Sequence, residues 1–216
     1  ADTLSGRAGN DTYLVDNAAD VVVEALGAGT DEVYSWVTLG LAANVERLTL
    51  GGEGAISGAG NALDNRIIGN AGANSLSGLD GKDVLTGYAG NDRLTGGAGA
   101  DTLTGGTGLD SFRFDSALSA ATNIDRIADF VVADDTVQLE NAIFKAYTST
   151  GALTSGTLRA GSGYTTAADA NDHIIYNSST GALYYDADGS GTASAAVQFA
   201  TLSTGLALTH ADFALT

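Results

Sequence analysis

The sequence predicts an all-β protein wound as a flattened solenoid of parallel strands. The main observation is an array of nine-residue units between Gly60 and Arg113 that contains no insertion or deletion. Each unit joins a glycine-rich half, where the backbone turns sharply at positive φ, to a half with one large apolar residue. The second half is too short for a helix but long enough for a brief strand with one inward side chain. Two units then make one coil, and alternate units stack on the same edge.

Three columns define the repeating unit. Position one is glycine in every unit, and position four is glycine in all but one of them. Position eight is always large and apolar, and this column contains Ile67, Leu76, Leu85, Leu94, Leu103 and Phe112. Position six contains Asn65, Asn74, Asp83, Asp92, Asp101 and Asp110. An apolar residue at every ninth position indicates a repeating core and argues against a flexible linker.

The acidic column indicates a metal. Stacking of alternate units places Asp83 beside Asp101 on one edge and Asp92 beside Asp110 on the other, about 4.8 Å apart. Carboxylates at that spacing repel each other by roughly 1 kcal/mol in water, and by more near a protein surface. A cation between them removes this penalty, and carboxylate and carbonyl oxygens in a loose turn suit Ca²⁺. The spacing therefore predicts calcium sites along both edges, a pattern known for β-helical nonapeptide repeats.

The units GLDGKDVLT, GYAGNDRLT, GGAGADTLT and GGTGLDSFR, from Gly78 onward, resemble the RTX (repeats-in-toxin, hemolysin-type) nonapeptide G-G-x-G-x-D-x-U-x. The spacer LAANVERLTLGGEGAISGAGNALDN also resembles segments found between repeat blocks in that family. The resemblance implies a parallel β-roll (a β-solenoid) with a C-terminal β-rich capping and secretion-signal subdomain, as in serralysin-like C-terminal domains. It also implies several calcium ions, about four or more.

The resemblance further implies how each calcium is held. In the family, an ion takes carbonyls two and four and the aspartate of one coil, with carbonyls one and three and the aspartate of the coil stacked on it. On this chain, one site would use Leu79, Gly81, Asp83, Gly96, Ala98 and Asp101. A site on the opposite edge would use Tyr88, Gly90, Asp92, Gly105, Thr107 and Asp110. The other repeat glycines expected at the sites are Gly78, Gly87, Gly97 and Gly99. Asn65 and Asn74 offer amide oxygens without charge, so the sites that they share are expected to be weaker.

Residues 1–59 are expected to form irregular coils of the same solenoid, and residues 60–113 the regular roll. Asp11 falls at position six of an early unit, GRAGNDTYL, and is a further candidate ligand. The predicted inward residues of this part are Val22, Val33, Leu48 and Ile56. Two interpretations stay open for Glu24, Asp31 and Glu46, which are either ligands or part of a solvated edge. Trp36 is expected to be a packing or edge residue, since lone aromatic residues usually pack.

Residues 114–216 are predicted to form the β-rich cap, because the last coil would otherwise expose its core and strand edges. The segment NIDRIADFVVADDTVQLENAIF predicts two strands that cover the end of the roll. By resemblance to the cap of the family, Asp125 and Asp135 complete the sites next to Asp101 or Asp110. A solvated acidic face is an equal alternative for these two residues.

The remaining residues predict a loop over 145–170 with a short helix near Ala167–Asn171, and then three strands joined by the turns NSSTG and DADGSG. Asp186 and Asp188 resemble the start of a helix–loop–helix calcium loop. Val197 stands where such a loop needs a glutamate, so a plain hairpin turn is favoured. The chain ends in LALTHADFALT, an acidic and apolar tail.

Composition excludes several classes of protein. The formal net charge is −17, with nine Lys and Arg against 26 Asp and Glu, which argues against a nucleic-acid or anionic-membrane surface. There is no cysteine, and therefore no disulfide framework and no zinc-thiolate site. The two histidines, His173 and His210, lie outside any H-E-x-x-H motif, and G-x-S-x-G is absent. No apolar run is long enough to span a membrane. We expect no active site within these residues.

The expected function is a calcium-binding module that folds on extracellular calcium and supports type I secretion of a larger protein. The resemblance implies an uncleaved signal in roughly the last 50–60 residues, a type I exporter as a partner, and a secreted or cell-surface location. We expect a monomeric module at the C-terminal end of the longer chain. Two alternatives stay open for that chain: a secreted enzyme such as a protease, lipase or polysaccharide epimerase, or an adhesin or surface-layer protein.

Overall fold

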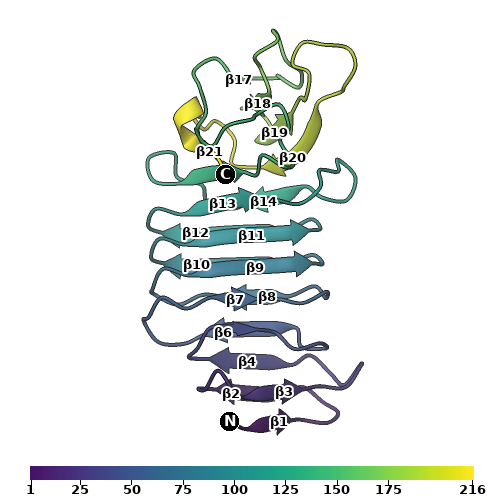
Figure 1. The fold of residues 1–216 in the computed structure, drawn as a ribbon, viewed down its shortest axis with the longest axis vertical. Helices are drawn as coiled ribbons and strands as arrows, with labels where there is room; N and C mark the ends of the chain where they lie inside the picture. Colours follow the sequence, from purple (N-terminus) through teal and green to yellow (C-terminus); the bar gives the residue numbers. More distant parts are fainter.

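The computed structural model describes residues 1–216 as an elongated stack of short strands that advances coil by coil from the N terminus to the C terminus (Figure 1). Nearly all of the regular structure is β, with one 3₁₀ turn at His210–Asp212. No helix is of the length and apolar character that crossing a membrane requires.

Two long sheets form the opposite walls of the stack. The eleven-stranded sheet has the order β17 (Leu158–Gly161), β18 (Ile174–Asn177), β19 (Ala182–Tyr185), β20 (Val197–Thr201), β14 (Asp125–Ile127), β12 (Thr102–Thr107), β10 (Val84–Ala89), β8 (Arg66–Ile68), β6 (Arg47–Leu50), β4 (Glu32–Ser35) and β2 (Thr12–Val15). The eight-stranded sheet has the order β16 (Gly151–Ala152), β21 (Phe213–Leu215), β15 (Thr136–Leu139), β13 (Ser111–Phe114), β11 (Arg93–Ala98), β9 (Ser75–Asp80), β7 (Gly58–Ala59) and β5 (Leu39–Gly40). A separate pair contains β1 (Thr3–Ser5) and β3 (Val21–Val23).

The strands of the repeats pair in parallel and in the predicted register. Leu85 pairs with Ile67 on one side and Leu103 on the other, whereas Leu94 pairs with Leu76 and Phe112. Successive nine-residue units therefore alternate between the two walls, and alternate units are neighbours in one sheet. The predicted parallel β-solenoid, with two units per coil, is confirmed.

The apolar column of the repeats forms the core. Its six members at position eight are at most 1% exposed, and they belong to one cluster of 30 buried residues that continues into the C-terminal part. Full burial of such a side chain contributes about 1.5–3 kcal/mol. In the irregular coils Val33 and Leu48 are buried, while Val22 and Ile56 are partly buried against the same cluster. Trp36 is 48% exposed and therefore lies at an edge, as predicted.

The two strands predicted after the repeats form as β14 and β15, but they continue the roll by one coil rather than covering its end. Arg126 of β14 pairs with Thr102, and Val137 of β15 pairs with Phe112, which adds one more coil to both walls. Ile127 and Val137 point inward in the same apolar columns and are 1% and 0% exposed. This apolar side of the coil has to be covered by something further along the chain.

The cover comes from the last part of the chain, at the top of Figure 1. Strand β20 pairs with β14, and β21 pairs with β15, so the C-terminal tail is a strand of the second wall. The predicted set of three strands and two turns is confirmed as the antiparallel run β18-β19-β20. Phe199 of β20 packs edge to face against Phe144, with ring centroids 5.2 Å apart.

The helix predicted near Ala167–Asn171 is absent, and the segment forms bends and turns. The carboxylate of Asp172 accepts the N–H groups of Ala168 and Asp169, at 2.9 and 3.4 Å, and these local bonds compete with a helix. The loop predicted over 145–170 also contains two short strands, β16 and β17.

Candidate metal centres

Acidic and amide residues line the two edges of the roll in two ladders. Each member stands immediately before a strand or at its first residue, because position six precedes the strand half of the unit. The first ladder, along the eleven-stranded sheet, contains Asp11, Asp31, Glu46, Asn65, Asp83, Asp101 and Asp125. The second, along the eight-stranded sheet, contains Asn74, Asp92, Asp110 and Asp135. Of these residues, all but Asp11 and Glu46 are buried.

One oxygen of each carboxylate is used by the neighbouring coil. The backbone N–H of Asp83 donates to Asp101 Oδ1, and that of Asp92 to Asp110 Oδ1, both at 2.8 Å. The N–H groups of Asp101 and Asp110 donate in the same way to Oδ1 of Asp125 and Asp135, at 3.1 Å. The structure thus places Asp125 and Asp135 next to Asp101 and Asp110 and buries both, rather than leaving them on a solvated face.

The second oxygen of the repeat aspartates has no partner. Oδ2 of Asp83, Asp92, Asp101 and Asp110 is buried and forms no hydrogen bond. Buried polar atoms without a partner are uncommon in proteins, and each needs an explanation such as a bound ion. The residues present therefore fit a cation along both ladders.

Glycine leaves room for oxygen atoms around these free carboxylate oxygens. A Cβ atom on Gly78 would lie 2.1 Å from Asp83 Oδ2 and 2.5 Å from the carbonyl oxygen of Gly96. On Gly87 it would lie 2.2 Å from Asp92 Oδ2 and 2.6 Å from the carbonyl oxygen of Gly105. The free oxygen of one coil and a carbonyl of the next therefore face the same space, which a side chain at position one would fill.

The remaining predicted ligand carbonyls lie at the contacts between coils. A Cβ atom on Gly97 would lie 1.9 Å from Leu79 O, and one on Gly99 would lie 1.6 Å from Gly81 O. On the other edge, Cβ atoms on Gly106 and Gly108 would each lie 1.9 Å from a carbonyl oxygen, that of Tyr88 or Gly90. The carbonyl oxygens of Ala98 and Thr107 accept the N–H groups of Gly81 and Gly90, respectively, both at 3.0 Å, and each keeps a second lone pair.

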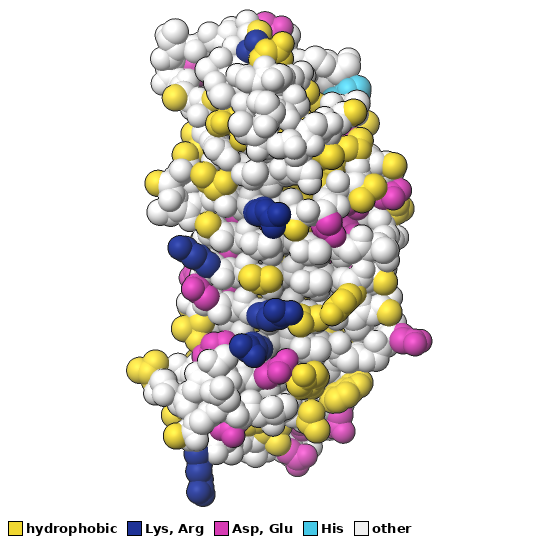
Figure 2. Space-filling model, turned by 180° about the vertical axis from the view of Figure 1, so that it is seen from behind, with side chains coloured by type: hydrophobic (Ala, Val, Ile, Leu, Met, Phe, Trp, Pro, Cys, Tyr) yellow, Lys and Arg dark blue, Asp and Glu magenta, His cyan; other side chains and the backbone are white.

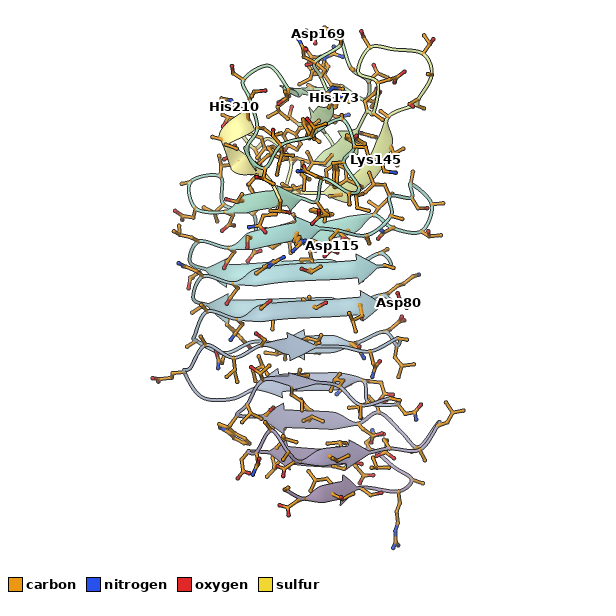
Figure 3. The ribbon with its side chains drawn as sticks, in the orientation of Figure 1. Asp80, Asp115, Lys145, Asp169, His173 and His210 are labelled. Carbon is orange, nitrogen blue, oxygen red and sulfur yellow. The ribbon has the colours of Figure 1, made fainter.

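The exposed side chain of Asp80 projects from the edge of the roll (Figure 3) and takes no part in the ladder.

The buried aspartates of the regular repeats and of the coil after them have pKa values above that of free aspartate. Burial raises the pKa of Asp83 to about 7, although the N–H of Asn65 opposes the shift and Asp101 adds to it. Burial raises the pKa of Asp92 to about 6, opposed by the N–H of Asn74. Burial is also the main reason for the raised pKa values of Asp101, Asp110, Asp125 and Asp135. Without a cation, ionising these groups is therefore unfavourable.

Asn65 and Asn74 hold their coils in a different way. Asn74 Nδ2 donates to the carbonyl oxygen of Ile56 at 2.8 Å, and its Oδ1 accepts the N–H of Asn70 at 2.8 Å. Asn65 Nδ2 donates to the carbonyl oxygens of Val45 and Glu46, at 3.3 and 3.4 Å. Amide N–H groups thus bind carbonyl oxygens of the preceding coil.

Sequence reasoning missed Asn61 and Asn70, which complete these amide contacts. Asn61 Nδ2 donates to the carbonyl oxygens of Ala42 and Val45, at 2.8 and 2.7 Å. Asn70 Nδ2 donates to those of Gly51 and Gly54, both at 3.0 Å. The signal that was available is an asparagine at position two in both of the early units, where the later units have Leu, Tyr or Gly.

Asp129 was also missed, although it lies in the segment that resembles the family's cap. Its Oδ1 accepts the N–H of Gly105 at 2.9 Å, and its Oδ2 accepts the N–H of Gly106 at 2.8 Å. Both oxygens are therefore used to tie β12 to the last coil.

In the cap, one carboxylate oxygen, Asp188 Oδ1, is buried without a hydrogen-bond partner. His173 and His210 both lie there, beyond the last coil (Figure 3), and His173 Nδ1 lies 2.8 Å from the carbonyl oxygen of Asp186. Asp188 Oδ2 accepts the N–H groups of Ala193 and Ser194, at 2.9 and 3.2 Å. One oxygen of this carboxylate therefore closes its own turn, and the plain turn favoured from the sequence stays a prediction.

Comparison with known proteins agrees with this geometry. The sequence matches the RTX calcium-binding nonapeptide repeat, with four copies within residues 1–22, 59–94 and 77–112. The chain is 37% identical over 67 residues to the endo-1,3-1,4-beta-glycanase ExsH of Rhizobium meliloti (strain 1021), a match that covers 31% of this chain and 14% of that enzyme. The chain therefore spans a small part of this curated relative.

Two solved structures are also similar, both of subunits of an Azotobacter vinelandii mannuronan C5-epimerase in solution. AlgE6R3 has 27% identity and a TM-score of 0.44, over 70% of this chain and 77% of that subunit. AlgE6R2 has 27% identity and a TM-score of 0.47, over 74% of this chain and 91% of that subunit.

A parallel roll with buried acidic ladders and free carboxylate oxygens belongs to the class of calcium-binding β-rolls. Its matched residues, 1–22 and 59–112, are RTX calcium-binding nonapeptide repeats. Such repeats are structural units that bind calcium and not catalytic ones. Calcium supplies the positive charge that the paired carboxylates otherwise lack, and the chain supplies oxygens already held in place by the N–H groups of the coils.

The two kinds of coil contact predict different responses to calcium. Replacing Asp101→Asn removes a charged ligand, so its cost in the free energy of unfolding should grow as the calcium concentration rises. Replacing Asn65→Ala removes amide contacts, so its cost, about 1–3 kcal/mol, should be the same at every calcium concentration at which the chain folds. Urea unfolding at a series of calcium concentrations measures both. Equal calcium dependence in the two variants would contradict the assignment.

The raised pKa values predict that acid stabilises the metal-free fold. Asp83 titrates near 7 when folded and near 4 when unfolded, so the folded state binds more protons between these values. The stability gained from protonation is therefore full below about pH 4 and lost as the pH rises through about 7. Metal-free protein should therefore gain β signal in far-UV circular dichroism on going from neutral to mildly acidic pH. With saturating calcium the stability should instead fall in acid, because protons compete with the ion. A metal-free β signal that does not increase in acid would contradict this expectation.

Proposed function

We propose that this chain is a module that folds when it meets millimolar calcium outside the cell and supports type I export of a larger protein. The observation that carries this proposal is the set of buried Oδ2 atoms of Asp83, Asp92, Asp101 and Asp110, none of which has a partner. Their burial is costly without a cation, so the calcium-free fold is penalised by its own ligands.

The proposed ligand sets are those implied by the repeats. One ion takes the carbonyls of Leu79, Gly81, Gly96 and Ala98 with Asp83 and Asp101; the ion on the other edge takes those of Tyr88, Gly90, Gly105 and Thr107 with Asp92 and Asp110. The carbonyls facing the repeat glycines support these sets. Asp125 and Asp135 extend the ladders by one coil. The proposed organisation is irregular coils over 1–59, regular repeats over 60–113, and a C-terminal part over 114–216.

The size of the calcium effect is sufficient for such a switch. For an extracellular type of site with Kd ~10⁻⁴ M, millimolar calcium stabilises the fold by about RT ln 11, or ~1.4 kcal/mol. Four sites of this kind together contribute about 5–6 kcal/mol, which is comparable to the net stability of a domain. At cytosolic calcium concentrations this contribution is near zero and only carboxylate repulsion is left. A chain with this property stays unfolded for export and folds afterwards.

Calcium removal tests the folding part of the proposal. At neutral pH in excess chelator, far-UV circular dichroism should show mostly coil, and millimolar calcium should restore the β signal cooperatively. Magnesium should substitute poorly, because it requires tighter octahedral geometry than stacked turns provide. The same β content with and without calcium would overturn the proposal.

Secretion from a host with a matched type I exporter tests the export part. Deletion of the residues after Ala160 should abolish secretion, because the proposed signal lies in the last segment. The full-length Asp101→Asn variant is the matched control: its calcium-dependent folding is impaired but its C terminus is intact, so it should still leave the cell. Secretion of the truncated chain at the full-length level would place the signal elsewhere.

One observation favours a secreted enzyme as the longer protein that carries this module. The curated relative, with 37% identity over 67 residues, is an endo-1,3-1,4-beta-glycanase, and the match covers 14% of its length. In this proposal the module is monomeric, works outside the cell, and lies on the same chain as a separate catalytic part. An adhesin or surface-layer protein is the alternative.

A further inference from the structure

We propose that Asp11, Glu24 and Asp31 bind one additional calcium ion, at a site in the irregular coils that the nonapeptide pattern does not supply. Each of the three side chains offers a carboxylate oxygen, and these oxygens all lie within 4.8 Å of one another. The matched repeats include Asp11 but neither Glu24 nor Asp31. The site is near the N-terminal end of the roll, at the bottom of Figure 1.

Glu24 enters the ladder from a different part of the coil. Asp11 precedes β2 and Asp31 precedes β4, and these two strands pair in parallel with Thr12 opposite Glu32. Glu24 follows β3, which belongs to the separate two-stranded sheet. The segment between β2 and β4 therefore brings a third carboxylate, that of Glu24, close to those of Asp11 and Asp31. The regular coils bring only aspartates or asparagines of position six to this place.

The cluster contains buried oxygens that nothing in the protein satisfies. Asp31 is fully buried, its Oδ1 accepts the N–H of Asp11 at 2.8 Å, and its Oδ2 has no partner. Asp11 Oδ2 is also buried without a partner. Glu24 is 9% exposed. No lysine or arginine forms an ion pair with any of the three, so a bound cation is the available source of positive charge.

Glu24 is held in place independently of any ion. The hydroxyl of Tyr13 donates to Glu24 Oε2, and the N–H of Ala25 donates to Oε1 at 2.9 Å. Asn44 Nδ2 donates to the carbonyl oxygen of Glu24 at 3.0 Å and fixes its backbone. Each carboxylate oxygen keeps a lone pair after these bonds. The site is therefore preorganised, with the third carboxylate oriented by a tyrosine.

The donor set selects the ion. All the available ligands are oxygens, with no nitrogen or sulfur, which favours calcium over zinc or copper. Three carboxylates also carry one more negative charge than the aspartate pairs of the regular repeats, so this site should bind calcium more tightly. The inference rests on the proposed function only in taking calcium as the ion that the protein meets.

Calcium binding to the full chain tests the site. The variant Glu24→Gln keeps the size of the side chain and an acceptor for Tyr13 but removes the charge. It should bind one ion fewer than the wild type by isothermal titration calorimetry, or bind its tightest ion at least about tenfold more weakly. The control is Glu32→Gln, whose carboxylate accepts the hydroxyl of Thr49 at 3.1 Å outside the cluster. It should match the wild type. Equal stoichiometry and affinities in all three proteins would overturn the inference.

Terbium luminescence gives a second readout that does not depend on Glu24→Gln folding. Because Tyr13 contacts Glu24, its ring should transfer excitation to Tb³⁺ bound in the cluster. Tyr13→Phe should therefore lower tyrosine-excited Tb³⁺ emission, whereas Tyr164→Phe, a control in the cap, should not. Equal emission from both variants would contradict the site. If the wild type itself binds no calcium, the proposed function fails; if it binds several ions and only the Glu24 and Tyr13 effects are missing, this inference alone fails.

Discussion

The burial of like charges is the constraint on which the rest of this roll depends. Each repeat aspartate is almost fully buried, within one coil of another carboxylate, and has one oxygen without a partner. Against this cost, the strands from β8 to β12 each contribute only one large buried apolar residue to the core. In the proposed function the fold is therefore conditional: the side chains that oppose it in the absence of a cation become favourable contacts when the cation is present.

Neighbouring coils are joined by two different kinds of contact. In the later units, carboxylates and carbonyls surround a space that suits a cation. In the early units, the amides of Asn61, Asn65, Asn70 and Asn74 donate to carbonyls of the preceding coil and take the place of the ion. These amide contacts carry no charge. The segment that they join lies between the acidic cluster near the N terminus and the acidic repeats, so the proposed calcium sites with charged ligands form two groups.

The regular part of the fold is predictable from the sequence because its signal repeats. A glycine at position one leaves space for an oxygen atom. A shift of one residue in the register of the strands would turn the apolar column toward solvent, so the register is strongly specified. The coil made by β14 and β15 was mistaken for a cap because longer loops separate its strands from those that they pair with. The N–H of Asp101 donates to the carboxylate of Asp125, which lies 24 residues later in the chain. In the regular repeats the equivalent donor and acceptor are 18 residues apart. The nine-residue period is therefore lost at this coil, although the same hydrogen bond from a backbone N–H to a carboxylate forms.

Contacts between irregular segments could not be predicted from the nine-residue repeat. The role of Glu24 depends on the path of β3, which no repeat fixes, and the amide donors of Asn61 reach residues 16 and 19 positions earlier. The exposure of Glu24 and Asp31 could not be decided from residue type, since acidic residues are usually solvated. Here the coil itself removes them from water.

The hydrogen bonds from backbone N–H groups to the ladder carboxylates all run in one direction along the chain. The N–H groups of Asp11, Asn65, Asp83 and Asp101 each donate to a carboxylate that lies further toward the C terminus, and the second ladder follows the same rule. Loss of one carboxylate therefore leaves an unsatisfied N–H in the coil before it, while the coil after it keeps its own donor and acceptor. A substitution in a ladder should therefore disturb the coil on its N-terminal side more than the coil on its C-terminal side, although the repeats look alike.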